Sequence, residues 1–174
     1  MSFKLDEARE VLTQTPDVLR ALLNGKSEIW LHSRKSPQSF SPIDVIGHLI
    51  HADRTDWIPR AQQILRGDGS KPFEPFDRFG FQPSLAGKTV ETLLDEFAEA
   101  RRQSLQTLDA LGVEAQQLEL QGTHPEFGAV TLGNLLATWV VHDLGHISQI
   151  VKIMSSVYRE AVGPWHAYLS ILNE

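Results

Sequence analysis

The segment WVVHDLGHISQI places His142 and His146 four residues apart in an otherwise apolar run. Side chains at i and i+4 of a helix project from the same face, so two such imidazoles can reach one ion. Neutral imidazole is a good ligand for zinc, nickel, copper and iron. The alternative is a pair of core histidines bonded to carbonyls or carboxylates. Because H-x-x-x-H pairs are common by chance, the spacing alone leaves both interpretations open.

A third ligand would have to come from elsewhere in the chain, and the segment GHLIHADR offers His48 and His51. The helix expected there has an apolar stripe formed by Ile43, Ile46, Ile50, Trp57, Ala61 and Ile64. His48 lies on the other side of the helical wheel, among polar and small residues. That position fits either solvent or the wall of a polar cleft between helices, and periodicity does not separate the two.

The elements that must position these histidines are helices. Apolar periodicity and capping residues predict helices over 5–24, 42–66, 89–111 and 132–158, and a short terminal helix beginning at Gly163-Pro164. Thr15-Pro16 predicts a break in the first helix, and Pro59 predicts a bend in the second. Residues 67–87 are interpreted as a packed loop, and no convincing strand pattern is found. The sequence therefore predicts one all-α domain over residues 1–174, a four-helix bundle.

The fourth helix carries almost no charge. Between residues 129 and 158 the only charged residues, histidines aside, are Asp143 and Lys152. A helix that is apolar nearly all round is covered on both sides. We therefore expect a homodimer, in which a partner chain covers Trp57 of the second helix and the outer face of the fourth, formed by Ala137, Val141, Leu144, Ser148 and Ser155. An unpaired carboxylate in such a helix is costly, so Asp143 needs a partner.

Composition limits the functional classes. The formal net charge is −6 and the chain has no basic run, which argues against a nucleic-acid partner. The chain has no cysteine, so thiolate ligands, disulfides and a cysteine nucleophile are excluded. The amino-terminal segment has no apolar leader, and no uncharged run is long enough to span a bilayer. These features predict a cytoplasmic protein without a membrane segment.

Two segments together resemble a known family. SPIDVIGHLIHADR, followed about ninety residues later by TLGNLLATWVVHDLGHISQI, is similar to the DinB/YfiT-like superfamily. The matching elements are His48-Leu49 with Asp53 five residues on, then His142, His146 and the following Gln149. The resemblance implies a four-helix bundle with one long crossover connection. It also implies that His48, His142 and His146 hold one divalent metal ion, with zinc or nickel favoured over iron or manganese. Three ligands would leave a coordination position open, as in catalytic sites.

Other residues are candidates for supporting roles. His51, one turn from His48, could be an outer partner or a substitute ligand. His124 could line the mouth of a cleft or serve as a turn residue before Pro125. Asp53 and Asp143 could orient ligating rings through their N–H groups, and Gln149 lies in the family motif.

Three functions compete. A metal-dependent enzyme of the thiol-dependent transferase or hydrolase type would use the ion to activate water or a thiol, and any thiol would be a low-molecular-weight cosubstrate. A non-catalytic metal-binding or stress-related protein would use the ion only to fasten two helices. A metalloprotease ranks last, because HDLGH has Asp143 where H-E-x-x-H has its longer general base.

Overall fold

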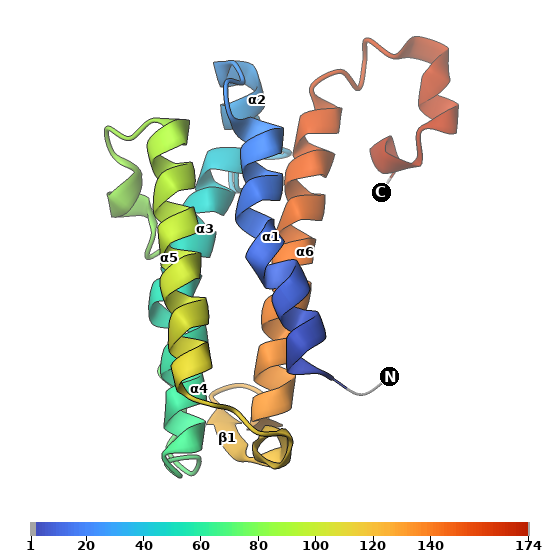
Figure 1. The fold of residues 1–174 in the computed structure, drawn as a ribbon. Coiled ribbons are helices and arrows are strands. Elements are labelled where there is room, and N and C mark those ends of the chain that lie inside the picture. Colours follow the sequence, from blue (N-terminus) through green and yellow to red (C-terminus); the bar gives the residue numbers. More distant parts are fainter. Residues whose placement is uncertain (1–2, 174) are drawn as a thin grey trace.

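The computed structural model describes residues 3–173 as a bundle of long helices (Figure 1). The bundle is formed by α1 (Leu5–Leu23), α3 (Pro42–Thr55) with its continuation α4 (Trp57–Leu65), α5 (Val90–Ala110) and α6 (Leu132–Ser156). Helix α1 packs against α5 and α6, and α3 packs against the same two helices. The expected apolar stripe of the second helix is buried along its whole length. The all-α four-helix bundle is therefore confirmed.

The connection between α4 and α5 is the long crossover of the fold. In Figure 1, α3, α4 and α5 all run down the bundle, so residues 66–89 must return along it before α5 begins. This connection contains the short helix η1 (Gln82–Leu85) and is anchored by Phe73 and Phe81, which are both buried. The interpretation of 67–87 as a packed loop agrees with these contacts.

Helix α3 begins as its sequence predicts and ends earlier. Ser41 and Asp44 form a capping box, and Pro42 occupies the first helical turn. The predicted end near residue 66 agrees with α4, which ends at Leu65, but the predicted local bend is a one-residue interruption at Asp56 between α3 and α4. Pro59 accounts for this position: its ring lacks an N–H for the carbonyl of Thr55 and would clash with it. The helix therefore breaks one turn before the proline.

Helix α1 runs through Pro16 without the predicted break. A proline inside a helix deprives the carbonyl four residues earlier of its donor, here that of Leu12. The guanidinium of Arg101 on α5 supplies the missing hydrogen bond, with Nη1 2.9 Å from the Leu12 oxygen. The Thr15 hydroxyl bonds to the carbonyl of Val11 in the same turn. A donor from a neighbouring helix thus replaces the bond that proline removes, and the helix continues.

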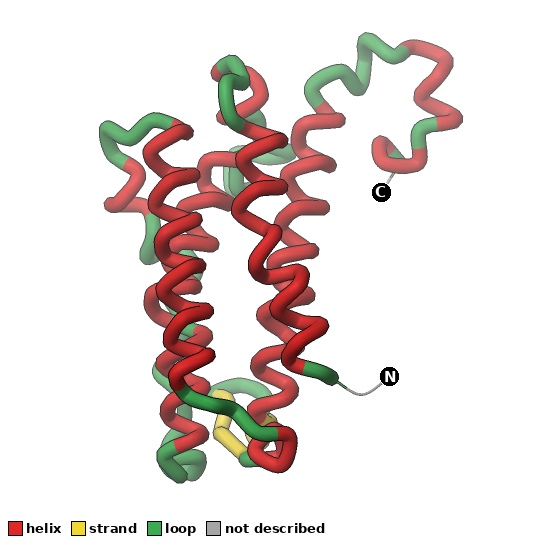
Figure 2. The backbone as a smooth tube through the Cα atoms, in the orientation of Figure 1, coloured by secondary structure: helices red, strands yellow, loops and turns green. Residues whose placement is uncertain are grey.

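A small antiparallel hairpin precedes α6, although no strand was predicted. Strands β1 (Gln121–His124) and β2 (Gly128–Thr131) pair with Gly122 opposite Val130, at the base of the bundle in Figure 2. A side chain at Gly122 would collide with Phe73 and Ile64. Such short strands, with a glycine where a side chain would alternate, carry no period-2 signal. Thr131 then forms a capping box with Asn134 and starts α6.

The remaining elements are short. Helix α2 (Glu28–His32) interrupts the first connection, and η2 (Ala115–Glu119) precedes the hairpin. The predicted terminal helix consists of two 3-10 segments, η3 (Gly163–Tyr168) and η4 (Ser170–Leu172), in a segment that leaves the end of α6 (Figure 1). Within residues 3–173, no helix combines the length and apolar character needed to cross a bilayer.

Candidate metal centre

Three histidines converge between α3 and α6. The Nε2 atom of His142 lies 3.1 Å from Nε2 of His48 and 3.1 Å from Nε2 of His146. All three rings offer a ligand atom within 4.8 Å of the others. Nitrogen ligands at 2.0–2.1 Å from a tetrahedral zinc would stand about 3.3 Å apart. The spacing of this group, called the histidine triad below, therefore fits one divalent ion.

The protonation state of the triad favours binding of a cation. Burial, with a contribution from the nearby His146, lowers the pKa of His48 to about 4 and that of His142 to about 3. Burial also lowers the pKa of His146. Three neutral imidazoles at neutral pH have lone pairs available, and an ion would displace few protons on binding.

Outer contacts set the orientation of two of the rings. His48 Nδ1 lies 3.3 Å from the backbone carbonyl of Arg78, and His146 Nδ1 lies 2.9 Å from Gln149 Oε1. Because both partners accept, each Nδ1 donates and each Nε2 presents a lone pair to the centre. The three Nε2 atoms then share at most one proton, which a neutral His142 could carry on its own Nε2. A cation satisfies this arrangement better than hydrogen bonds among the rings. Among the described residues, His142 Nδ1 has no hydrogen-bond partner.

The structure separates His48 from His51. His48 belongs to the triad, whereas His51 is half-buried and its ring packs against Phe76 at a centroid distance of 5.2 Å. The second helix therefore contributes one histidine to the triad. His124 combines both of its expected roles, since it lines the pocket beside the triad and its Nδ1 accepts the backbone N–H groups of Glu126 and Phe127.

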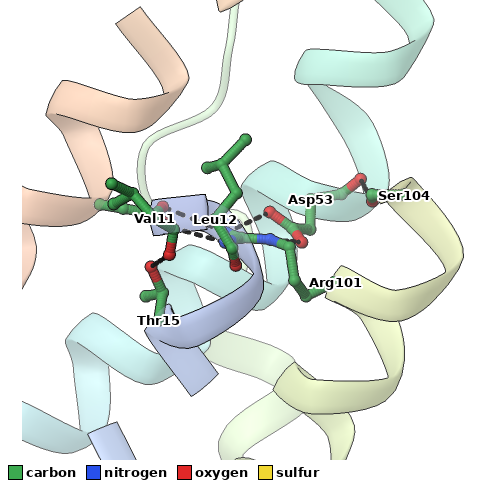
Figure 3. A network of polar contacts seen from close by, with 7 residues as sticks. Val11, Leu12, Thr15, Asp53, Arg101 and Ser104 are labelled. Carbon is green, nitrogen blue, oxygen red and sulfur yellow. Dashed lines mark hydrogen bonds and ion pairs between the residues drawn. The ribbon is translucent and has the colours of Figure 1, made fainter. Parts of the chain in front are cut away.

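The aspartates Asp53 and Asp143 contact Arg101, and the expectation that they orient histidine rings is corrected. Nε and Nη2 of Arg101 bind Asp53 at 2.7 and 3.0 Å, and Nη1 and Nη2 bind Asp143 at 2.5 and 3.1 Å. With the bond to Leu12, all five guanidinium N–H groups are used. Figure 3 shows Arg101 with two of these partners, Asp53 and Leu12. Burial raises the pKa of Asp53 to about 6, and Arg101 opposes this shift. This arginine network joins α1, α3, α5 and α6 one residue from His142.

A cavity of about 500 Å³ opens beside the triad. Its apolar walls come from Trp57, Phe76 and Phe127 and from two prolines, and its charged residues are Asp56, Arg60, Arg78 and Glu126. The α4 segment, the crossover and the tip of the β1–β2 hairpin therefore all contribute to one pocket. Sequence reasoning missed the contributions of Arg78 and Phe76, since the loop that carries them has no period that could be assigned to a helix or strand.

The fold and the triad define a class of protein: a four-helix bundle with a long crossover and a three-histidine group, suited to a metal ion, beside a cavity. Within that class the chain belongs to the DinB superfamily, whose family model matches residues 11–150. No curated protein matches the chain.

Two solved structures share the fold. YfiT from Bacillus subtilis, described as a probable metal-dependent hydrolase with an unusual four-helix bundle topology, has a TM-score of 0.73 and 20% identity, with 92% of this chain and 90% of that chain covered. TT2238, a four-helix bundle protein, has a TM-score of 0.59 and 18% identity, with 84% and 98% covered.

Proposed function

We propose that the protein is a metal-dependent enzyme, a hydrolase or a thiol-dependent transferase, with His48, His142 and His146 as ligands of one zinc or nickel ion. The single observation that carries the proposal is the cavity of about 500 Å³ onto which the triad opens. An ion that only fastened two helices would need no such space. A bound ion would polarise a carbonyl and lower the pKa of a coordinated water or thiol. The description of YfiT as a probable metal-dependent hydrolase supports the hydrolase alternative.

The residues around the triad have separable roles in this proposal. Arg78 and Gln149 hold two rings in the ligating tautomer through their oxygen atoms. Trp57 and Phe76 form apolar walls that exclude water from the reacting groups. Asp56 lines the same cavity, and burial raises its pKa to about 6, so this carboxyl can gain or release a proton near neutral pH. Any thiol must come from a cosubstrate, because the chain has no cysteine.

The proposal predicts close to one divalent ion per chain, measured by elemental analysis of protein purified without chelator. Hydrolysis of p-nitrophenyl esters, or transfer from an added small thiol, should disappear with chelation and return with the ion. Substoichiometric metal after loading with zinc, nickel, iron and manganese in turn would contradict the metal centre. A full metal complement that changes only the melting temperature would favour a structural ion instead.

We also propose a homodimer through the outer face of α6. Val141 and Leu144 on this face are 67% and 47% exposed, which is unusual for neighbouring aliphatic side chains. Trp57 does not belong to the interface as expected, because it is 5% exposed and stacks on Trp139 inside the chain. Trp165, in the carboxy-terminal segment that follows α6, is a further exposed aromatic side chain.

Light scattering at about 10–50 micromolar, a range in which a stable interface holds, should give twice the chain mass. The double variant Val141→Glu, Leu144→Glu should give the chain mass with unchanged helical content. A monomeric wild-type protein would refute the dimer.

A further inference from the structure

The cations of the pocket differ in whether they are neutralised. Arg60 is bonded through Nε to Asp56 at 2.7 Å, and both side chains are about nine-tenths buried. Arg78 forms no ion pair with any carboxylate of the described residues and is an exposed residue of the crossover. The remaining pocket carboxylate, Glu126, is exposed at the hairpin tip. With a divalent ion in the triad, the pocket would carry net positive charge in a chain of formal charge −6.

Arg78 is held in place although it has no carboxylate partner. Its guanidinium carbon lies 5.0 Å from the ring centroid of Phe40 and 5.8 Å from that of Phe79, two cation–π contacts that limit its rotamers. The Phe40 ring is in turn 5.5 Å from the His48 ring. The backbone oxygen of Arg78 accepts the His48 Nδ1–H bond. One residue thus orients a triad ring through its main chain and also lines the same pocket.

An exposed arginine with no further contacts is ordinarily a solvated surface residue. Three features distinguish Arg78: it lines the triad pocket, two aromatic rings orient it, and the other cation of the pocket is neutralised. A guanidinium offers paired N–H donors that match a carboxylate or phosphate. An aromatic wall beside it, from Phe76 and Phe127, suits a ligand that combines an anionic group with an apolar body.

We propose that the substrate is a small anionic molecule, with a carboxylate or phosphate group bound by the guanidinium of Arg78 while its reacting group lies at the triad. Arg78 is therefore a specificity-determining residue. The inference rests on the proposed metal-dependent function, because it places the reacting group at the ion. It adds the chemical class of the substrate and the residue that selects it.

The test compares two probes by isothermal titration to the zinc-loaded protein: benzoate, with one carboxylate, and isophthalate, with two. One carboxylate of either acid can reach the ion, but only isophthalate has a second for Arg78. We expect isophthalate to bind roughly tenfold more tightly, the scale of one charge-assisted bidentate contact at an accessible site. The advantage should shrink as salt is raised. 3-Phosphonobenzoate, titrated in the same way, replaces the second carboxylate by a phosphonate and so separates a phosphate preference at Arg78 from a carboxylate preference.

Variants locate the effect. Arg78→Gln should bind both acids equally, and Arg78→Lys should keep part of the difference through its charge. The metal content of both variants should stay at the wild-type value, because residue 78 keeps its backbone carbonyl. Arg66→Gln is the matched control: it removes the same charge from an exposed position outside the pocket and should behave as wild type.

Equal affinities for the two acids in the wild type, or an advantage that survives in Arg78→Gln, would overturn the inference. Its failure can be distinguished from failure of the proposed reaction. An Arg78-dependent preference in a protein that hydrolyses no ester and transfers no thiol supports the anion site and contradicts the enzyme. Metal-dependent turnover without the preference does the reverse.

Discussion

Alanine in place of His48, His142 or His146 should lower the affinity for zinc or nickel by more than about 100-fold, beyond the roughly 10–100-fold cost of losing an outer partner. The reason is geometric. Two ligands are fixed four residues apart on α6, one faces them from α3, and each Nε2 converges on the same point. Competition with a coloured chelator would rank the variants, and circular dichroism should show that all remain helical.

Two neighbouring variants serve as controls for this prediction. His51→Ala should change the affinity by less than about tenfold, because its ring packs against Phe76 and lies outside the triad. Gln149→Ala should fall between the two groups, at about 10–100-fold, because its Oε1 atom orients His146. If His51→Ala proved more damaging than His48→Ala, the assignment of the ligand on α3 would be wrong.

All three triad histidines could be predicted from sequence. On α6 the prediction came from the local i, i+4 spacing, and on α3 it came from the resemblance to the family motif. The i, i+4 spacing of His142 and His146 survives folding unchanged. On α3, periodicity alone placed His48 on a polar face of the helix, which could equally have been exposed to solvent. That face is interior: every residue from 41 to 50 is buried, because α6, the crossover and α5 surround the helix.

What sequence reasoning missed depends on contacts between distant segments. Arg101 was not singled out as a structural residue, yet it is buried whereas the adjacent Arg102 is exposed. The burial of Arg101 could have been predicted, because it lies four residues after Phe97 and four before Leu105, on the buried face of α5. The partner that Asp143 required could not be named from sequence. Helical periodicity shows which positions are buried, but it does not show which buried groups contact each other. The hydrogen bond from Arg101 to the Leu12 carbonyl, which lets α1 continue past Pro16, belongs to the same network.

Arg101→Leu should lower the free energy of unfolding by about 3–5 kcal/mol, the cost of breaking a buried ion pair from one side. It leaves the carboxylates of Asp53 and Asp143 without a cation and the carbonyl of Leu12 without a donor. Urea denaturation of the metal-free protein measures the loss. The matched control is Arg102→Leu, which removes an exposed pairing with Glu99 and should change stability little.

The pH dependence of this loss identifies its cause. Without Arg101, which lowers the pKa of Asp53, burial should raise that pKa further above 6. A carboxyl whose folded pKa lies above its unfolded value of 3.8 favours folding below the unfolded pKa and loses that contribution as pH rises through the folded one. The loss of stability in Arg101→Leu should therefore be smaller at pH 5 than at pH 8.

Adding Asp53→Leu and Asp143→Leu should recover part of the stability, because it removes the unpaired charges. It should not recover the part that came from the hydrogen bond to Leu12. A deficit independent of pH, with no recovery in the triple variant, would mean that Arg101 stabilises the bundle through packing alone.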